Sequence, residues 1–482
     1  MQLVNKHYPY KMRIKFLSII ACFLFVSIAI SSCLDSEDTY VVSSDATVHA
    51  FGLDTIHGRH YKFAIDQINR RIYNLEPLPV GADTLIDSIL IDTFQVNGYI
   101  TSGLTGLTGQ DTILNLNNHQ NLTGASRIYK GGNIQPVGDE PCLKFRIIAA
   151  DMETKLEYTL YLSIYEHDPD SMRWSKEATT GLPTASFADM QTAATLGDKL
   201  LLYVNENNAV KLYENSTTQY AAWSNPTLNG VTFSQLPELV KLNKLNAPQA
   251  RNQEMLFATA DQKVYQSADG SQWDEVSALI APQGYSLNKL ICGFENSLIG
   301  LFEKEGENYL MSSTQDITAW NVDTAVKMPE GFPTENIYAT EYQTSNLLNQ
   351  VMIVGKAKED AKKIIPWAYD GNSWTMLDPD TEYKSYCLTE KLGFKPALMH
   401  YNDKFYMFGE RLNFIYTSKN QLAWYESDKK FFLPKEVDLR GNYTMAIDQN
   451  QYIWLISGGC KNPGQENNEV WRGRLNKFGY NN

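Results

Sequence analysis

The chain has 482 residues, of which 43% are apolar and 20% charged, and its formal net charge at pH 7 is −13. This length and composition predict a folded protein with two or more domains, unless one part is a repeat array. The acidic balance argues against a nucleic-acid partner, because such binding depends on Lys and Arg neutralising phosphates.

The N-terminus begins with a basic segment, Lys11–Lys15, followed by an apolar run, Phe16–Ile30, and then by Ser31-Ser32-Cys33. This order is that of a secretory signal, and the run is short for a membrane-spanning helix. A cysteine directly after two small residues resembles the lipobox of bacterial lipoproteins. The resemblance implies that residues 1–32 are a cleaved signal peptide and that Cys33 carries lipid. The alternative is a plain signal peptide with an incidental cysteine.

An acidic tether is expected at residues 33–43, because Leu34–Asp38 contains three carboxylates. This cluster resembles the surface-export signal of Bacteroides-type lipoproteins, which implies a lipid-anchored protein at the cell surface of the outer membrane. The alternative is a solvated acidic linker. The sequence leaves open whether translation starts at Met1 or at Met12.

Residues 44–165 show short alternating runs between turn signals. Period-two alternation is clearest in Tyr158–Ile164, and similar runs occur at Thr47–Phe51, Arg71–Leu75 and Lys144–Ile148. Many short strands without an amphipathic helix predict a β-sandwich.

Residues 166–482 contain a repeat marked by tryptophans that close hairpins. The gaps between them are 49, 50, 47, 54 and 50 residues, and the tryptophans are Trp174, Trp223, Trp273, Trp320, Trp374 and Trp424. A period near fifty residues is typical of kelch-like propeller blades.

An apolar strand precedes each repeat's hairpin, and six copies occur: Leu200–Tyr203, Met255–Ala258, Leu298–Leu301, Val351–Val354, Phe405–Phe408 and Tyr452–Leu455. The last copy continues into Val470–Leu475, with no fourth strand after it. The segment around Trp174 has no blade before it. The sequence therefore predicts a six-bladed β-propeller closed by the strand around Trp174, which removes an open sheet edge.

Two stretches of the repeat, His400–Gly409 and Ile453–Gly459, resemble kelch and galactose-oxidase-type propellers. The whole chain resembles a family of Bacteroides-type surface lipoproteins of unknown function. That family pairs an immunoglobulin-like N-terminal domain with such a propeller. The matching features are Ser44–Thr47, the Pro77–Asp83 loop, and Asp168–Ser171 leading to Trp174.

Known propeller chemistries fit this sequence poorly. Galactose oxidase needs two copper-binding histidines, whereas residues 171–482 contain one, His400, which is expected in the core on an inner strand. Ser267–Trp273 resembles the Asp-box of sialidases but is one residue shorter, and the Arg-Ile-Pro signature of that family is absent. Carboxylate pairs such as Glu303/Glu305 are expected in solvated loops.

No metal, cofactor or catalytic residue is predicted. The histidines of the first domain, His49, His57 and His60, lack a ligand spacing. The four remaining cysteines are widely spaced without a C-x-x-C pair, and they are expected to be free core thiols rather than disulfides: Cys142, Cys292, Cys387 and Cys460.

The sequence favours a non-catalytic binding or adhesion module for glycan or protein, anchored in the membrane through Cys33. The alternatives are a scaffolding subunit of an outer-membrane complex and, less favoured, a propeller-type glycosidase. Loops carry function on such folds. The candidates are expected on one rim: Asn205–Asn208, Glu303–Glu307, Lys356–Lys363 and Gly458–Asn467. The sequence does not single out ligand-binding residues among them.

Overall fold

The chain divides into two compact units, Met1–Glu166 and His167–Asn482. The computed structural model describes residues 42–101, 113–130, 133–136, 143–183, 191–244, 253–357, 362–377, 392–393, 395–410, 412, 414–427, 433–434, 436–437, 442–458 and 468–478. The proposed lipidation site Cys33 lies outside these residues, as do the signal segment and the tether up to residue 41. Within the described ranges, no helix is long and apolar enough to cross a membrane.

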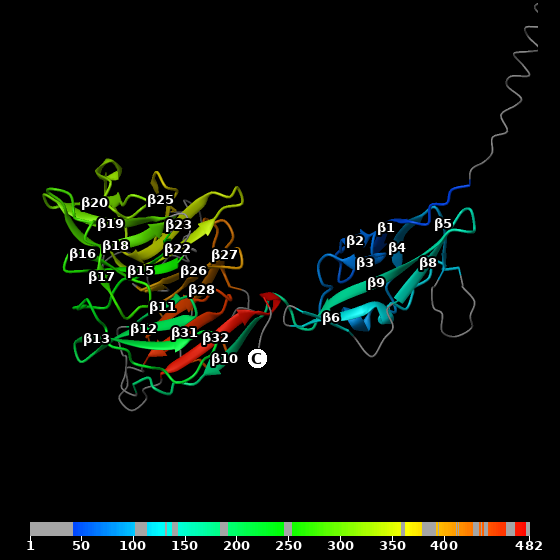
Figure 1. Ribbon diagram of the computed structural model, residues 1–482, viewed down its shortest axis with the longest axis horizontal. Coiled ribbons are helices and arrows are strands. Elements are labelled where there is room, and N and C mark those ends of the chain that lie inside the picture. The colour runs from blue at the N-terminus through cyan, green and yellow to red at the C-terminus, as the bar shows by residue number, and fades with distance from the viewer. Residues whose placement is uncertain are drawn as a thin grey trace, which may run out of the picture. The chain divides into compact units, whose positions relative to one another are not determined.

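The described residues of the first unit form a two-stranded sheet and a seven-stranded sheet (Figure 1). In the small sheet, β1 (Val48–Leu53) pairs antiparallel with β4 (Ile91–Val96). The strands of the large sheet are β2 (Phe63–Asp66), β3 (Arg71–Asn74), β5 (Gly98–Thr101), β6 (Ser126–Lys130), β7 (Asn133–Pro136), β8 (Leu143–Ala149) and β9 (Lys155–Tyr165). Short 3-10 turns, η1 (Ala82–Thr84) and η2 (Thr123–Ala125), lie between them.

Strand β9 is the centre of the large sheet. It pairs parallel with β3 and β6 and antiparallel with β8, which in turn pairs with β5. Alternate β9 residues, among them Tyr158 and Leu160, are buried in a core that both sheets share. Phe51 of β1 and Phe94 of β4 pack edge to face in that core, with ring centroids 5.2 Å apart.

The sequence correctly predicted strands at β1, β3, β8 and β9. It did not predict that β9 runs parallel to two of its neighbours. Period-two alternation reports which face of a strand is buried, and it is the same for parallel and antiparallel pairing.

The described residues of the second unit form six sheets, each built of sequential antiparallel hairpins (Figure 1). In chain order they are β11 (Gln191–Leu196), β12 (Lys199–Glu206) and β13 (Ala209–Ser216); β14 (Val240–Lys244), β15 (Gln253–Ala260), β16 (Lys263–Ser267) and β17 (Asp274–Glu275); β18 (Ser286–Phe294), β19 (Ser297–Lys304), β20 (Glu307–Ser312) and β21 (Val326–Lys327); β22 (Glu335–Gln343), β23 (Asn349–Lys356), β24 (Trp367–Tyr369) and β25 (Trp374–Met376); β26 (Ala397–Tyr401), β27 (Lys404–Phe408), β28 (Ile415–Ser418) and β29 (Tyr425–Glu426); and β30 (Asn442–Ile447), β31 (Ile453–Gly458) and β32 (Glu469–Leu475), which are joined by β10 (Met172–Glu177). The 3-10 turns η3 (Val322–Thr324) and η6 (Asn476–Phe478) also belong to this unit.

The second strand of every sheet is apolar on both faces, because a neighbouring sheet covers each face. In β12, Leu200 and Leu202 pack in a core shared with Trp454 of β31. Leu201, between them, faces the other way and packs in a core shared with Trp273 of the β14–β17 sheet. The six apolar runs found in the sequence are these second strands.

Comparable cores join each sheet to the next throughout the described part of the unit. One further core joins the β30–β32 sheet to the β11–β13 sheet, so the last sheet also contacts the first. Strand β10 pairs antiparallel with β32, and Trp174 lies opposite Gly473. The segment around Trp174 is therefore the outer strand of the sheet that contains β32, as its position in the repeat predicted.

Candidate functional site

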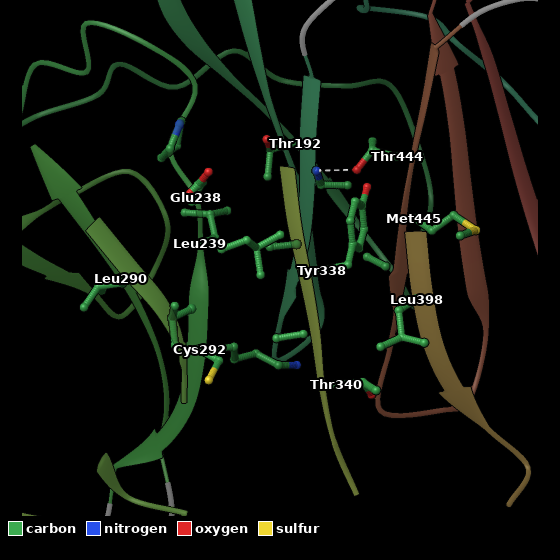
Figure 2. A pocket seen from close by; sticks show the side chains of 18 of the residues that line it. Thr192, Glu238, Leu239, Leu290, Cys292, Tyr338, Thr340, Leu398, Thr444 and Met445 are labelled. Atoms are coloured by element: carbon green, nitrogen blue, oxygen red, sulfur yellow. Dashed lines mark hydrogen bonds between the residues drawn. The ribbon is translucent and has the colours of Figure 1, made fainter. Parts of the chain in front are cut away.

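The first strands of all six sheets line one cavity of about 770 Å³, here called the inner-strand cavity (Figure 2). Its wall comes from β11, β14, β18, β22, β26 and β30, with additional side chains from the loops before β14 and β26. A concave site whose wall is made of strands is held more rigidly than one made of loops.

Hydrogen bonds between β11 and β30 fix one part of this wall. The Ala193 N–H donates to Thr444 Oγ1 at 3.0 Å, which is the dashed line in Figure 2, and Thr195 Oγ1 donates to the Ile447 carbonyl at 2.7 Å. Gln191 Nε2 donates to the Asn442 carbonyl of β30 at 3.3 Å and to the Ile456 carbonyl of β31 at 2.9 Å. Side chains thus join the first strands of two sheets that share no backbone ladder.

Irregular pairing shapes another part of the wall. Strand β22 shifts register between Glu335 and Tyr338, and Asn336 within this bulge has a φ of 50°. Asparagine tolerates this left-handed conformation better than most residues. A β-bulge bends its strand and changes the direction of the side chains that follow. Tyr338 and Thr340, which both face the cavity, come directly after this bulge (Figure 2).

The cavity wall carries more carboxylates than cations. Two of its three lysines lie close to carboxylates: Lys289 Nζ is 3.0 Å from Glu238 Oε1, and Lys241 Nζ is 3.3 Å from Glu254 Oε1. The full set of charged wall residues, apart from His400, is Glu238, Lys241, Glu254, Lys289, Glu295, Glu335, Glu341, Lys395 and Glu410.

Glu341 lies beside Glu295 in the wall, and its carboxyl group has a perturbed pKa. The backbone N–H of Glu295 donates to Glu341 Oε1 at 3.0 Å, and Asn349 Nδ2 donates to Glu295 Oε1 at 3.1 Å. Glu341 is exposed to the cavity, but the protein around it removes much of the bulk water. This burial raises the pKa of Glu341; the Glu295 N–H lowers it, and the Glu295 charge raises it further.

Two tyrosines add hydroxyl groups to the wall. Burial raises the pKa of Tyr338, although a hydrogen bond with Thr444 opposes this shift. The Tyr443 hydroxyl donates to the Gly409 carbonyl at 2.5 Å. With Thr192 and Thr340, these groups give the cavity neutral hydrogen-bonding surface beside its charges.

His400 lies on the inner strand β26, where the sequence placed it, but it is not a core residue. It is half-buried and lines the cavity. Its ring contacts Phe405 and Tyr342, with centroid distances of 4.7 and 5.6 Å. Burial lowers the pKa of His400, while the charge of Asp403 raises it, with a net downward shift.

Two of the predicted loops lie where they were expected, between second and third strands. Asn205–Asn208 joins β12 to β13, and Glu303–Glu307 joins β19 to β20, but neither lines the cavity. Lys356–Lys363 is described only in part, and Gly458–Asn467 lies outside the described residues after position 458. Sequence reasoning missed Glu295 and Glu341, whose only signal was their position at the end of a first strand.

The described residues hold no cluster of three or more His, Cys, Asp or Glu side chains arranged for a metal ion. Cys292 is a free, buried thiol. The other cysteines expected to be free, Cys142, Cys387 and Cys460, lie outside the described ranges.

Comparisons with solved structures return propellers of several kinds. An alpha-L-arabinanase of Penicillium chrysogenum, solved with arabinobiose, is 12% identical with a TM-score of 0.39, covering 64% of this chain and 100% of that one. A member of the DUF4221 family from Bacteroides vulgatus is 9% identical with a TM-score of 0.35, covering 64% and 98%. A subtype N10 neuraminidase-like protein of A/little yellow-shouldered bat/Guatemala is 9% identical with a TM-score of 0.33, covering 62% and 98%.

Curated proteins give no match to the chain. Two family models do match it. The DUF6242 N-terminal domain, a domain of unknown function, matches residues 33–162, and the DUF6242 beta propeller domain matches residues 168–482. The protein therefore belongs to the DUF6242 family, with that family's N-terminal domain followed by its β-propeller.

Proposed function

We propose that the protein is a non-catalytic binding module, held at the cell surface through lipid on Cys33, that takes a glycan or protein ligand in the inner-strand cavity. The cavity itself carries the proposal: it is concave, it has a volume of about 770 Å³, and its wall is built from strands. Tyrosine and threonine hydroxyls beside carboxylates suit a ligand rich in hydroxyl groups.

The proposed architecture is a six-bladed, kelch-like propeller after an immunoglobulin-like domain. The six described sheets, the tryptophan period near fifty residues and the core between the last and first sheets support the blade number. In the first unit, two sheets over one core support a sandwich.

The surface location rests on the order of the N-terminal residues, with Cys33 directly after two serines and an acidic segment following it. Labelling cells with radioactive palmitate tests it. Incorporation that Cys33→Ser abolishes supports the anchor, whereas label retained by Cys33→Ser contradicts it. Protease added to intact cells then reports whether the anchored chain is outside.

A glycan array on the soluble chain from residue 39 tests the binding function. Ala339 lines the cavity, so the indole ring of Ala339→Trp narrows it, and Ala222→Trp adds the same ring at an exposed position away from the wall. Binding lost in the first variant and kept in the second supports the cavity. A blank array contradicts the glycan form of the proposal, and cross-linking in outer membranes then separates a protein ligand from a scaffolding role.

One observation favours a second function, a glycoside-processing enzyme. A carboxyl group with a raised pKa beside a second carboxylate is typical of a general acid, and Glu341, with Glu295 next to it, has this character. Incubation with the polysaccharides that bind the array tests it by measuring new reducing ends. Product formation that Glu341→Gln abolishes supports the enzyme, whereas intact polysaccharide contradicts it.

A further inference from the structure

The charges of the inner-strand cavity differ between its two ends. The described part of its wall contains six glutamates and three lysines. Near the end where the first strands begin, Lys289 pairs with Glu238 at 3.0 Å, and Lys395 lies just before β26. At the end where these strands finish, Glu295 lies directly after β18, and Glu341 lies close to the end of β22.

Contacts between neighbouring first strands show that their ends lie level with one another. The Glu295 N–H donates to Glu341 Oε1 at 3.0 Å, which joins the ends of β18 and β22. The His400 ring, near the end of β26, lies 5.6 Å from the ring of Tyr342, near the end of β22. Lys395 precedes the start of β26, so the length of that strand, about 13 Å, separates its backbone from the level of the two carboxylates.

Neither Glu295 nor Glu341 forms an ion pair with any cation that the structure describes. Lys241, the wall lysine of β14, pairs with Glu254 instead, at 3.3 Å. Both glutamates are exposed, and each accepts a hydrogen bond at Oε1 alone, so Oε2 of each accepts none from the described chain. His400 adds no positive charge at neutral pH, because burial holds its pKa below the ordinary value. Two carboxylates at one end of the cavity thus remain open to a cationic ligand.

Open hydroxyl groups line the same cavity. Thr192 of β11 and Thr340 of β22 both belong to its wall (Figure 2), and neither hydroxyl has a hydrogen-bond partner among the described residues. A hydroxyl donates one hydrogen bond and accepts two, whereas an ammonium group donates three and accepts none. A ligand that carries an ammonium group beside several hydroxyls therefore matches the two open carboxylates and the two threonines together. The volume of about 770 Å³ is in the range of small-ligand sites.

We propose that the ligand of the inner-strand cavity is an oligosaccharide of amino sugars with free amines, one of whose ammonium groups binds between Glu295 and Glu341. The assignment rests on the proposed binding function and names the chemical class of its ligand. The amine must be free, because acetylation removes its charge and two of its donors. A lysine-rich peptide also carries ammonium groups, but it lacks the ring hydroxyls that would pair with Thr192 and Thr340.

Calorimetric titration of the soluble chain from residue 39 with a glucosamine trimer tests the proposal. The measurement is made at about pH 6, below the pKa of ordinary amines, so that the sugar amines are charged. The N-acetylglucosamine trimer is the matched probe, because it keeps the sugar rings and removes the charge. We expect the glucosamine trimer to bind and the acetylated trimer to bind at least about tenfold more weakly, the size of one charge-assisted hydrogen bond.

Single substitutions locate the ammonium site. Glu341→Gln and Glu295→Gln are each expected to weaken binding of the glucosamine trimer about tenfold and to change binding of the acetylated trimer by less than about twofold. Glu303→Gln is the matched control. Glu303 is exposed, belongs to the same sheet as β18 and lies outside the cavity wall, so its loss changes the net charge equally. Binding by this variant should stay within about twofold of that by the native chain.

Several outcomes overturn the ammonium site without overturning the cavity as a binding site. If both trimers bind equally and Ala339→Trp weakens both, the cavity holds sugar but does not select the amine. If neither trimer binds, the amino-sugar class is wrong, and the glycan array alone decides the proposed function.

Two further results exclude its rivals. If Glu303→Gln weakens binding as much as Glu341→Gln, general charge attraction explains the result and the proposal fails. If trilysine binds as tightly as the glucosamine trimer and Glu341→Gln weakens it equally, the site takes a cationic peptide and the sugar class is wrong. Melting temperatures that do not fall in the two glutamine variants show that the loss of binding is not a loss of folding.

Discussion

The indole ring of Trp174 packs directly over Gly473, its partner across the antiparallel β10/β32 pair. A Cβ atom at position 473 would lie 2.5 Å from a carbon of this ring, too close for any side chain. Gly473→Val is therefore expected to lower the free energy of unfolding by about 1–3 kcal/mol through overpacking. Urea denaturation of the purified chain measures it.

A double-mutant cycle is the control for this prediction. Trp174→Ala removes the ring that the new side chain would strike, so Gly473→Val should cost much less in that background. Equal costs in the two backgrounds would mean that the ring does not restrict position 473.

The turn before β17 depends on Asp269. Its Oδ1 accepts hydrogen bonds from the N–H groups of Ser271 and Gln272, both at 2.8 Å. Asp269→Ala is expected to destabilise the second unit by about 1–2 kcal/mol, and Asp269→Asn by less, because the amide oxygen keeps an acceptor. Asp274→Ala, at a nearby exposed position, is the control and should have little effect in the same melting experiment.

The contribution of Asp269 also depends on pH. Burial raises its pKa, but the N–H donors of Gln272 and Ser271 outweigh this and lower the pKa below the ordinary 3.8. A carboxylate whose pKa is lower in the folded than in the unfolded state stabilises the fold at pH values above its unfolded-state pKa. This stabilisation is lost as the pH falls through the folded-state pKa. The difference in stability between the native chain and Asp269→Ala should therefore shrink as the pH is lowered below about 3.8. A constant difference over that range would contradict a role for the charged form.

Ionisation of Glu341 is expected to lower the stability of the fold, whereas ionisation of Asp269 raises it. The pKa of Glu341 is raised in the folded protein, so stability falls as pH rises from the ordinary value of 4.5 through the folded value. Glu341→Gln keeps an oxygen for the Glu295 N–H and removes the charge. The variant should be more stable than the native chain at neutral pH and equal to it well below pH 4.5. Melting temperatures of the native chain and Glu341→Gln across this pH range test the prediction. A variant that is less stable than the native chain at neutral pH would contradict it.

Cys292 should resist thiol reagents in the folded protein. Only 1% of its surface is exposed, and burial, with a smaller effect of the Glu341 charge, raises the pKa of its thiol. The thiolate is the reactive form, so alkylation should be very slow until the chain unfolds. Mass spectrometry of the Cys292 peptide after iodoacetamide, with and without denaturant, measures this. Rapid labelling without denaturant would show that the β18 strand opens.

The repeat was readable in the sequence because its strongest elements are covered on both faces. Leu200–Tyr203 and its five counterparts are apolar runs, and Trp273 is buried at a hairpin turn, so packing constrains these residue types. Apart from the inner strand expected at His400, the first strands were not readable. Strand β11 (Gln191–Leu196) faces the cavity on one side, and the bulges of β18 break its alternation, so neither pattern marks a strand.

The candidate site could not be predicted for a related reason. Glu295 and Glu341 are 46 positions apart, and they meet because adjacent sheets bring the ends of their first strands together. No local pattern encodes this meeting. The parallel pairing of β3 and β6 with β9 was unpredictable in the same way, because alternation does not reveal strand direction.

The β10/β32 pair also sets the order in which the second unit can fold. Ser175 and Arg472 are bonded to each other although 297 positions separate them, so this pairing closes a very long loop and is expected late in folding. Until β32 arrives, β31 presents an unpaired edge that another chain could extend. For a chain threaded across a membrane from its N-terminus, the first unit can finish folding while the second still waits for its last strand. A delay at that stage is the point of greatest exposure to aggregation.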